Sequence, residues 1–432
     1  MKLYVQSLES WLHPSDVFIT LHGNDGHSFW LDREHHPTHR FSVVGGSNGL
    51  VSESRASLSQ HLNSLRWSDD SESDLPFEFR PGLVGAFGYE PEFDRFLKVD
   101  RALVFDHDNR AIYFVGAFAD QEHFSHWTQA ALLRLALVGG EQAQYRIANG
   151  GGEVWAPTLR HEASAYLGLI ERAQRHIAEG DVYQVCLTNE IRLETTVDPL
   201  LTFLRLREQN PAPYASFMRL GDVSLVSASP EQFLEADASG QISSKPIKGT
   251  RRRGVSASED EAISLELASD AKERAENLMI VDLMRNDLGQ VCEVGSVDVP
   301  KLFEVETYAT VHQLVSTVTG TLKTDSHVLD AIEAAFPGGS MTGAPKIRAM
   351  EIIEQLEAGS RGNYSGAMGF IAANGAVELG MVIRTLVFRE GSASIGVGGG
   401  ITIDSHPMAE LEETKLKAKA LLRALGADDP WA

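Results

Sequence analysis

Apolar and polar residues alternate in short runs over residues 1 to about 150, and clusters of glycine, asparagine, aspartate and histidine separate the runs. Runs of this kind are typical of β-strands with at least one buried face. They predict strands at residues 17–21, 41–44, 83–89 and 111–115. We therefore expect the N-terminal part to be rich in sheet.

A glycine-rich segment, residues 149–153, follows this part and precedes Pro157. Glycine-rich stretches serve as flexible linkers, although three glycines can equally form a wide hairpin. We interpret the segment as the junction between an N-terminal half, residues 1–150, and a second half, residues 155–428.

The second half alternates helical and strand patterns in blocks. Apolar residues recur at helical spacing over residues 162–179, where Gly180 is placed to end the helix, and further helices are predicted at 260–290 and 407–425. Strands are predicted at 223–228, 311–322, 367–373, 381–388 and 393–397. Blocks of helices and strands without strict alternation favour a layered α+β fold over a doubly wound one.

The charge balance limits the possible partners. The chain has 432 residues, and 38 lysines and arginines against 60 aspartates and glutamates give a formal charge of -22. Such a field repels nucleic acid and anionic membranes, so an anionic ligand must be held by local positive charge. The run Arg251-Arg252-Arg253 is the densest basic run, and we interpret it as a solvated loop rather than a polyanion site.

Two cysteines, Cys186 and Cys292, are 106 positions apart and form no CxxC pair. This usage indicates a reducing compartment, without a disulfide framework or a cysteine zinc site. The sequence has no run of 18 apolar residues and no basic, then apolar, leader at its start. A cytoplasmic protein without a membrane segment is therefore expected.

Paired carboxylates are the strongest chemical pattern. Glu273 and Glu276 are three residues apart on one predicted helix, and Glu410 and Glu413 repeat the spacing on another, with Lys417 on the same face. Converging helices could use such pairs to hold Mg2+, which prefers oxygen ligands. The spacing does not show convergence, and taken alone each pair favours a solvated helix face.

Two glycine-rich segments, residues 336–340 and 398–400, could expose backbone amides to an anion, although a tight turn or bulge is the more common role. Lys248 lies in a turn-like context, where most lysines are solvated. Glu231 lies 17 residues upstream and could be its proton partner. His312 and Arg384 are single polar residues in strand-like runs, for which structural roles are at least as common.

Seven segments together resemble one family. They are PIKGT (246–250), RAENLMIVDLMRNDLG (274–289), VHQLVST (311–317), FPGGSMTGAPKIRAMEII (336–353), YSGAMGF (364–370), IRTL (383–386) and VGGGITIDS (397–405). In this order they are similar to the chorismate-utilising enzymes, and within that family to the synthase subunit, component I, of aminodeoxychorismate synthases. The resemblance is dense over residues 160–420, and before them residues 79–90 match best.

The resemblance implies a fold in which two large antiparallel sheets pack as a sandwich with helices outside. The two halves would then interleave as one composite unit. It also implies that Glu276 and Glu413 are Mg2+ ligands, supported by Glu273 and Glu410, and that the ion holds the ring carboxylate of chorismate.

The resemblance further implies how the rest of the substrate is bound. The group for its enolpyruvyl carboxylate would comprise Tyr364, Arg384 and the amides of Gly398, Gly399 and Gly400, because the planar guanidinium of arginine grips both oxygens of a carboxylate. Lys417 would add positive charge near the metal. Thr250, His312 and Ser340 match positions that line the pocket.

Lys248 separates the branches of the family, because anthranilate synthases carry alanine at this position. The resemblance implies that the Lys248 amine attacks C2 of chorismate, that the 4-hydroxyl leaves with a proton from Glu231, and that ammonia adds at C4. The product would be 4-amino-4-deoxychorismate, a precursor of 4-aminobenzoate and folate, formed by a transferase. The attack needs an uncharged amine, so burial or nearby cations must disfavour the charged form.

Ammonia is expected from a separate class I glutamine amidotransferase subunit, because neither cysteine lies in a recognisable glutaminase element. The alternatives are anthranilate synthase component I and the water-using isochorismate or salicylate synthases, which carry a water-activating lysine where this chain has Gln184. A third alternative is a catalytically silent binding subunit, which would not need the four glutamates.

A regulatory site is the last feature that the resemblance raises. Leu8-Glu9-Ser10 and residues 210–214 are similar to the two parts of the tryptophan feedback pocket of related anthranilate synthases. A structural role for the same residues is favoured, because a pocket of aromatic size can be filled by core side chains.

Overall fold

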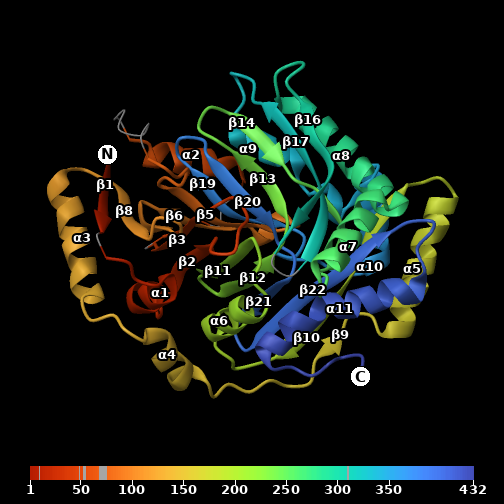
Figure 1. Ribbon diagram of the computed structural model, residues 1–432, viewed down its shortest axis with the longest axis horizontal. Coiled ribbons are helices and arrows are strands. Elements are labelled where there is room, and N and C mark those ends of the chain that lie inside the picture. Colours follow the sequence, from red (N-terminus) through yellow and green to blue (C-terminus); the bar gives the residue numbers. More distant parts are fainter. Residues whose placement is uncertain (9, 48, 52–54, 68–74, 309–310) are drawn as a thin grey trace.

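The computed structural model describes residues 1–8, 10–47, 49–51, 55–67, 75–308 and 311–432. Within these ranges two large antiparallel sheets pack face to face, and helices lie on their outer sides (Figure 1). The core between the sheets contains residues of both, among them Phe29, Leu31, Val84 and Phe370. The predicted α+β sandwich is confirmed.

The first sheet, sheet A, has 12 strands among the described residues, with β9 (Thr158–Leu159) paired beside β10. Its order is β1 (Lys2–Leu8), β8 (Ala111–Phe118), β7 (Arg101–Asp106), β3 (Phe41–Gly46), β2 (His27–Asp32), β11 (Tyr214–Leu220), β12 (Val223–Ser229), β21 (Thr385–Arg389), β22 (Ser392–Ile401), β10 (Gln184–Glu194) and β18 (Gly343–Ala344).

The second sheet, sheet B, has 10 strands among the described residues, with β16 (Asp298–Thr307) paired beside β17. Its order is β15 (Ile247–Arg252), β17 (Val311–Thr321), β14 (Gln241–Ser244), β13 (Gln232–Ala236), β20 (Val377–Met381), β19 (Ala367–Ala372), β5 (Gly82–Phe87), β6 (Arg95–Val99) and β4 (Leu50–Val51).

Strands from both ends of the chain share these sheets. In sheet A, β2 pairs with β11, and in sheet B, β5 pairs with β19. Two seams therefore join the residues before and after the glycine-rich segment 149–153, which follows a helix ending at Asn149.

Helices cover three surfaces of the sandwich. The outer face of sheet A carries α1 (Pro14–His22), α3 (Gln121–Leu135), α6 (Pro199–Gln209) and α11 (Pro407–Leu425), with α4 (Glu141–Asn149) packed on α1 and α6. The outer face of sheet B carries α2 (Arg55–Leu65), α8 (Ala271–Val291) and α9 (Val328–Ala335). Against β10 lie α5 (Ala163–Ala178) and α10 (Lys346–Glu357).

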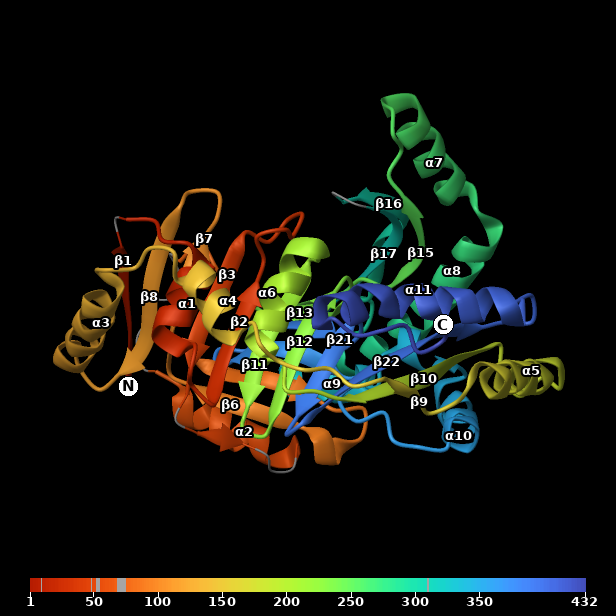
Figure 2. The same cartoon turned by 90° about the horizontal axis from the view of Figure 1, so that it is seen from below.

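One helix departs from this layered arrangement. Figure 2 shows α7 (Ala257–Ser269) rising from the body of the molecule beside β15, β16 and β17. Two 3-10 turns, η1 (Pro91–Phe93) and η2 (Gly339–Met341), complete the elements. Within the described ranges, none of the helices is long and apolar enough to cross a membrane.

Most predicted elements are present, and the errors have local causes. The predicted strand at 17–21 is wrong, because these residues belong to α1, where Val17, Phe18 and Leu21 share a buried face and His13 caps the first turn. The predicted strand at 381–388 is interrupted between β20 and β21, where Arg384 has φ 50, a conformation that a strand does not allow.

Helix ends follow capping chemistry. The prediction at 407–425 matches α11, which begins with Pro407 and ends before Gly426 in the left-handed conformation, φ 84. The predicted helix at 260–290 is two helices, because the Asp270 side chain accepts hydrogen bonds from the amides of Lys272 and Glu273 and so caps the start of α8.

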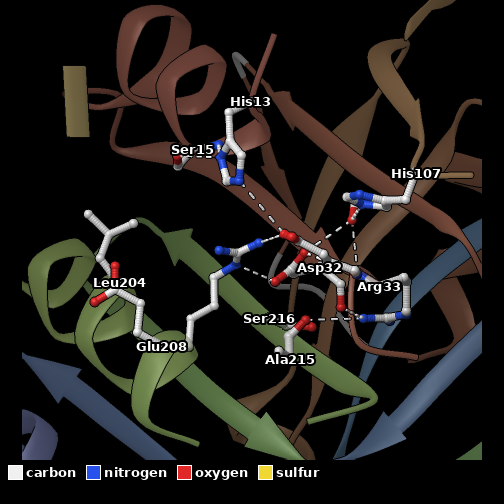
Figure 3. Close-up of polar contacts among 12 residues, drawn as sticks. His13, Ser15, Asp32, Arg33, His107, Leu204, Glu208, Ala215 and Ser216 are labelled. Carbon is white, nitrogen blue, oxygen red and sulfur yellow. Dashed lines mark hydrogen bonds and ion pairs between the residues drawn. The ribbon is translucent and has the colours of Figure 1, made fainter. Parts of the chain in front are cut away.

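A buried polar network joins α6 to the end of β2, and Figure 3 shows its centre at Asp32. Arg207 Nε donates to Asp32 Oδ2 at 2.5 Å, and its Nη2 donates to Glu34. Ser42 Oγ donates to Asp32 Oδ1 at 3.1 Å and contacts His107 Nε2 at 2.7 Å. Burial alone would raise the pKa of Asp32, but Arg207 outweighs it and the pKa lies below its usual range.

Candidate active site

A cavity of about 610 Å³ opens where β10, β15, β17 and β22 meet the helices α8 and α11. Its lining brings together segments that are far apart in the sequence. It includes every predicted site residue except His312: Glu231, Lys248, Thr250, Glu273, Glu276, Ser340, Tyr364, Arg384, Gly398, Gly399, Gly400, Glu410, Glu413 and Lys417.

Lys248 lies half-buried in this lining, on β15. The register of β15 against β17 shifts between Lys248 and Thr250, where Gly249 has φ 78 and stands against Leu267 and Glu273. A bulge at this point re-aims the neighbouring side chain, and only glycine fits the conformation without strain. The Lys248 side chain makes no hydrogen bond or ion pair with any residue of the described ranges.

Glu231 lies in the same cavity and is nearly buried. Ser340 Oγ donates a hydrogen bond to its Oε1 at 2.8 Å. Burial raises the pKa of Glu231, against the opposing effects of the Ser340 hydrogen bond and the Lys248 charge. The carboxyl therefore keeps its proton to a higher pH than a free glutamate, as a proton donor requires.

The glutamates of α8 and α11 line the cavity, and two of them have partners from outside their own helices. Arg251 Nη1 lies 3.3 Å from Glu273 Oε1, and Ser405 Oγ donates to Glu410 Oε1 at 2.7 Å. The first contact ties Glu273 to β15, which also carries Lys248, and the second ties Glu410 to the loop between β22 and α11.

The other two glutamates differ in their charge environment. Burial raises the pKa of Glu276, whose nearest cation is Lys272 Nζ at 3.8 Å. Burial acts on Glu413 in the same direction, but Lys417 Nζ at 2.7 Å outweighs it and lowers the pKa. Glu276 is therefore a half-buried carboxylate whose pKa stays raised despite the charges of Lys248 and Lys272.

The donor set fits a hard divalent cation. All four groups are carboxylates that line the cavity, and Mg2+ commonly takes only one or two of them together with water and ligand oxygens. A cation there would compensate the charge of Glu276. Among the residues that the structure describes, three ligand atoms within 4.8 Å occur only at His39, Glu235 and Glu378 and at His176, Glu179 and Asp181, so the glutamates of α8 and α11 form a looser group.

Arg384 and Tyr364 line the same cavity. Tyr364 packs on Gly396, where any side chain would overlap its ring, since an added Cβ would lie 2.1 Å from the ring. Arg384 lines the cavity, and its side chain makes no hydrogen bond or ion pair with a residue of the described ranges. Burial lowers the pKa of the Arg384 guanidinium, against the effects of Tyr364 and Glu413.

The three glycines 398–400 lie in β22 on the edge that faces the cavity. On one side β22 pairs with β10 throughout, but on the other its pairing with β21 ends at Ile395. Backbone groups beyond this point therefore have no strand partner on that side. Lys417 Nζ donates to one of them, the Gly398 carbonyl, at 2.8 Å.

His312 was expected to line the pocket, and this prediction is wrong. On β17 the alternate residues Val311 and Gln313 line the cavity, so His312 points to the other face of the strand. There its Nδ1 contacts Thr307 Oγ1 and its Nε2 contacts Asp260 Oδ1, both at 2.8 Å.

The interpretation of residues 251–253 as a solvated loop is also wrong. Arg251 and Arg252 end β15 and Arg253 follows it directly, and each arginine pairs with an acidic residue of α7 or at the start of α8. Arg251 Nη2 lies 2.9 Å from Asp270 Oδ2, Arg253 Nη2 lies 2.6 Å from Asp260 Oδ2, and Arg252 pairs with Glu259. The basic run therefore holds α7 and α8 against the strand that carries Lys248.

Leu8 and Tyr214, from the two segments compared with a tryptophan pocket, lie on strands that are not neighbours in sheet A. Leu8 ends β1 at the edge of sheet A, and Glu9 is outside the described residues. Tyr214 begins β11, and β8, β7, β3 and β2 separate the two strands. The Tyr214 hydroxyl donates a hydrogen bond to Glu235 Oε1 at 2.9 Å, and the Arg33 guanidinium lies 5.1 Å from the centre of the Tyr214 ring. Both contacts fit a structural role for Tyr214.

Several cavity residues were not predicted as site residues from the sequence, because no motif marks them as such: Cys186, Arg251, Lys272, Gln313, Met341, Ile383 and Leu416. Gln184 is fully buried, and neither atom of its side-chain amide has a partner among the described residues. An orphaned buried amide of this kind is a signal that only the structure provides.

The fold and the cavity define an enzyme-like α+β protein that can hold a small anion between cationic groups and carboxylates. The chain belongs to the chorismate binding enzyme family, whose model matches residues 26–423. It is 41% identical to the aminodeoxychorismate synthase of Streptomyces griseus over all of this chain, and it spans 65% of that protein. It spans about half the length of the next curated relatives that it matches.

Two further relatives have a length close to that of this chain. It is 35% identical to aminodeoxychorismate synthase component 1 of Escherichia coli K12, over 92% of each chain. The crystal structure of anthranilate synthase component I from Streptococcus pneumoniae superposes with a TM-score of 0.74 and 27% identity, over 98% of this chain and 92% of that one.

Proposed function

We propose that this chain aminates chorismate at C4 with ammonia, giving 4-amino-4-deoxychorismate for 4-aminobenzoate and folate synthesis. The observation that carries the proposal is the position of Lys248, whose half-buried side chain shares one cavity with Glu231, Arg384 and the carboxylates of α8 and α11. The aminodeoxychorismate synthases among the relatives support the same reaction.

Chorismate carries two carboxylates, and the cavity offers a binding group for each. Arg384, Tyr364 and the exposed backbone of residues 398–400 would receive the enolpyruvyl carboxylate. Mg2+ held by Glu276 and Glu413 would neutralise and orient the ring carboxylate. Glu273 and Glu410, fixed by Arg251 and Ser405, would support these ligands, and Lys417 would add positive charge.

Lys248 and Glu231 would carry the covalent chemistry. In its uncharged form the Lys248 amine would form a bond to C2, both ring double bonds would shift, from C1–C2 to C1–C6 and from C5–C6 to C4–C5, and the C4–oxygen bond would break as Glu231 gives its proton to the departing hydroxyl, which leaves as water. Ammonia then bonds to C4, both double bonds shift back, and the bond between Lys248 and C2 breaks. The new ammonium group returns a proton to Glu231, so both residues end in their starting states.

Ammonia would come from a separate glutamine amidotransferase subunit of class I. Burial raises the pKa of both thiols, Cys186 and Cys292, so neither is suited to the nucleophilic attack that glutaminases use. The relative named component 1 is consistent with a second subunit. The neutral amide of Gln184, where water-using relatives carry lysine, cannot act as a base toward water.

Incubation of the purified chain with chorismate, a magnesium salt and ammonium chloride tests the proposal. We expect a product with its amine at C4, identified by mass spectrometry and NMR. Anthranilate as the product would support anthranilate synthase component I instead, as in the structural relative. Absence of turnover with both ammonium and an added glutaminase subunit would indicate a silent subunit.

A further inference from the structure

A buried ion pair lies directly behind the wall of the active-site cavity. Arg361 and Glu357 have side chains that are each 1% exposed, and their guanidinium and carboxylate groups meet through two hydrogen bonds of 2.6 and 2.8 Å. Neither residue is among those that line the cavity. The Arg361 guanidinium also lies 4.7 Å over the ring of Tyr89.

The guanidinium holds two separate pieces of the cavity wall. Its Nη1 donates to the carbonyl of Met341 at 2.6 Å, and its Nη2 donates to the carbonyl of Cys186 at 2.8 Å. Both Met341 and Cys186 line the cavity, the first from η2 and the second from β10. One planar group therefore bridges η2 and the start of β10, alongside the backbone hydrogen bond from the Cys186 amide to the Thr342 carbonyl at 2.8 Å.

The carboxylate of Glu357 also contacts β10, at a second position. Glu357 Oε1 accepts a hydrogen bond from the amide of Thr188 at 2.7 Å, two residues beyond Cys186 on β10. Arg361 Nη1 also lies 3.3 Å from Ser365 Oγ, next to Tyr364 of the cavity. The pair thus contacts three of the segments that form the site.

The contact between Arg361 and η2 is connected to Glu231, the proposed proton donor, through Ser340. Ser340 immediately precedes Met341, and its hydroxyl donates to Glu231. A shift of the Met341 carbonyl would move the Ser340 backbone and change that hydrogen bond. Arg361 therefore acts on Glu231 through η2 without touching the substrate.

Energetics argue that the pair is not present for stability alone. Removing two charges from water costs several kcal/mol per ion, and apolar residues of similar volume often replace such pairs without loss of stability. What apolar residues cannot provide is a planar fork that binds two carbonyls in a fixed geometry. An ion pair with these contacts is suited to positioning.

We propose that Arg361, held by Glu357, is a positioning residue that fixes η2 against β10 and thereby sets the geometry of Ser340 and Glu231. Its effect on turnover rests on the proposed amination. Its effect on the wall itself does not depend on the reaction.

The substitution Arg361→Lys tests this role. Lysine keeps the charge beside Glu357 but cannot bind both carbonyls at once. We expect the kcat of ammonium-dependent amination to fall about 10- to 100-fold, the order expected for a misplaced catalytic group, with KM for chorismate changed less than about twofold. Because the Ser340 hydrogen bond lowers the pKa of Glu231, its loss should move the basic limb of the pH–rate profile to higher pH.

Arg33→Lys provides a matched control. Arg33 is also 1% exposed and pairs with a glutamate, Glu378, but lies outside the residues that line the cavity. We expect its kcat and pH profile to match those of the wild type. Equal losses of kcat in both variants would reduce Arg361 to a general stability role and overturn the proposal.

Hydrogen–deuterium exchange gives a readout that needs no turnover. In Arg361→Lys, amides of residues 184–188 and 339–342 should exchange faster than in the wild type. Peptides from the strands of sheet A on the β22 side of β10 should exchange at the wild-type rate. Unchanged exchange in both segments overturns the proposal. If the wild type aminates no chorismate, the proposed function fails, and the exchange experiment still decides whether Arg361 holds the wall.

Discussion

Two polar clusters of this molecule use the same residue types in opposite ways. Around Asp32 (Figure 3), Arg207 lies between the carboxylates of Asp32 and Glu34, and the hydroxyl of Ser42 donates to Asp32. In the active-site cavity, Lys248 and Arg384 have no partner among the described residues, and Glu276 has only a distant one. The first cluster is satisfied by the fold, whereas the second leaves charges free for a ligand.

The largest expected effect on the reaction rate follows substitution of Lys248, whose amine has no partner among the described residues. Lys248→Ala removes the proposed nucleophile, so we expect the rate of the proposed C4 amination to fall on the order of 10³-fold or more. Acid quenching followed by intact mass spectrometry should show a chorismate adduct in the wild type and none in the variant. An undiminished rate would remove the covalent role of Lys248.

A smaller effect is expected at the proton donor. Glu231→Gln should lower kcat by about 10²- to 10⁴-fold, the usual contribution of a general acid, with chorismate binding retained in isothermal titration calorimetry. The wild-type rate should fall as the pH rises through the raised pKa of Glu231, and the variant should lack this limb. The same limb in the variant would assign it to another group.

The same residue predicts a dependence of stability on pH. The folded-state pKa of Glu231 lies above its unfolded value, so its favourable contribution is complete at low pH and is lost as the pH rises through the folded-state pKa. Denaturant unfolding should therefore show Glu231→Gln gaining stability relative to the wild type as the pH increases. A constant difference would contradict the raised pKa.

Substitutions of the glutamates of α8 and α11 should raise the magnesium requirement to different degrees. Glu276→Gln or Glu413→Gln removes a proposed ligand, and we expect the magnesium concentration for half-maximal activity to rise by at least about 100-fold. Glu273→Gln changes a supporting residue, for which about tenfold is expected. Equal shifts in all variants would argue against two direct ligands.

A substitution in the cluster around Asp32 should lower stability and leave catalysis unchanged. Arg207→Met leaves the Asp32 carboxylate, 1% exposed, buried without its cation, so we expect a loss of about 3 to 5 kcal/mol in unfolding free energy. At a temperature where the variant is folded, kcat and KM for chorismate should be unchanged. A selective loss of kcat would show that this cluster is coupled to the cavity.

The fold was predictable where periodicity and capping agree. Pro407 and Gly426 mark the ends of α11 in the sequence as well as in the structure. The strand predicted at 17–21 failed because five apolar-rich residues suit a strand or a helix, and the cap at His13 that decides between them is an unusual one.

The site was predictable only as a set of residue types. Spacing placed Glu273 with Glu276 and Glu410 with Glu413, but the meeting of α8 with α11 depends on strand order in two sheets. His312 could not be placed without the register of β17, which sends its side chain away from the cavity. Arg361 was missed because its two hydrogen bonds to the cavity wall are to main-chain carbonyl groups, which leave no trace in the sequence.

The two seams, β2 with β11 and β5 with β19, constrain how the chain could be rearranged. A hybrid made by recombining two homologues near residue 150 would exchange one side of both seams in the same event. Each seam would then need compatible registers and compatible side chains at once. Mismatch at either seam would leave open strand edges, which promote aggregation, so shuffled halves should survive only between close homologues.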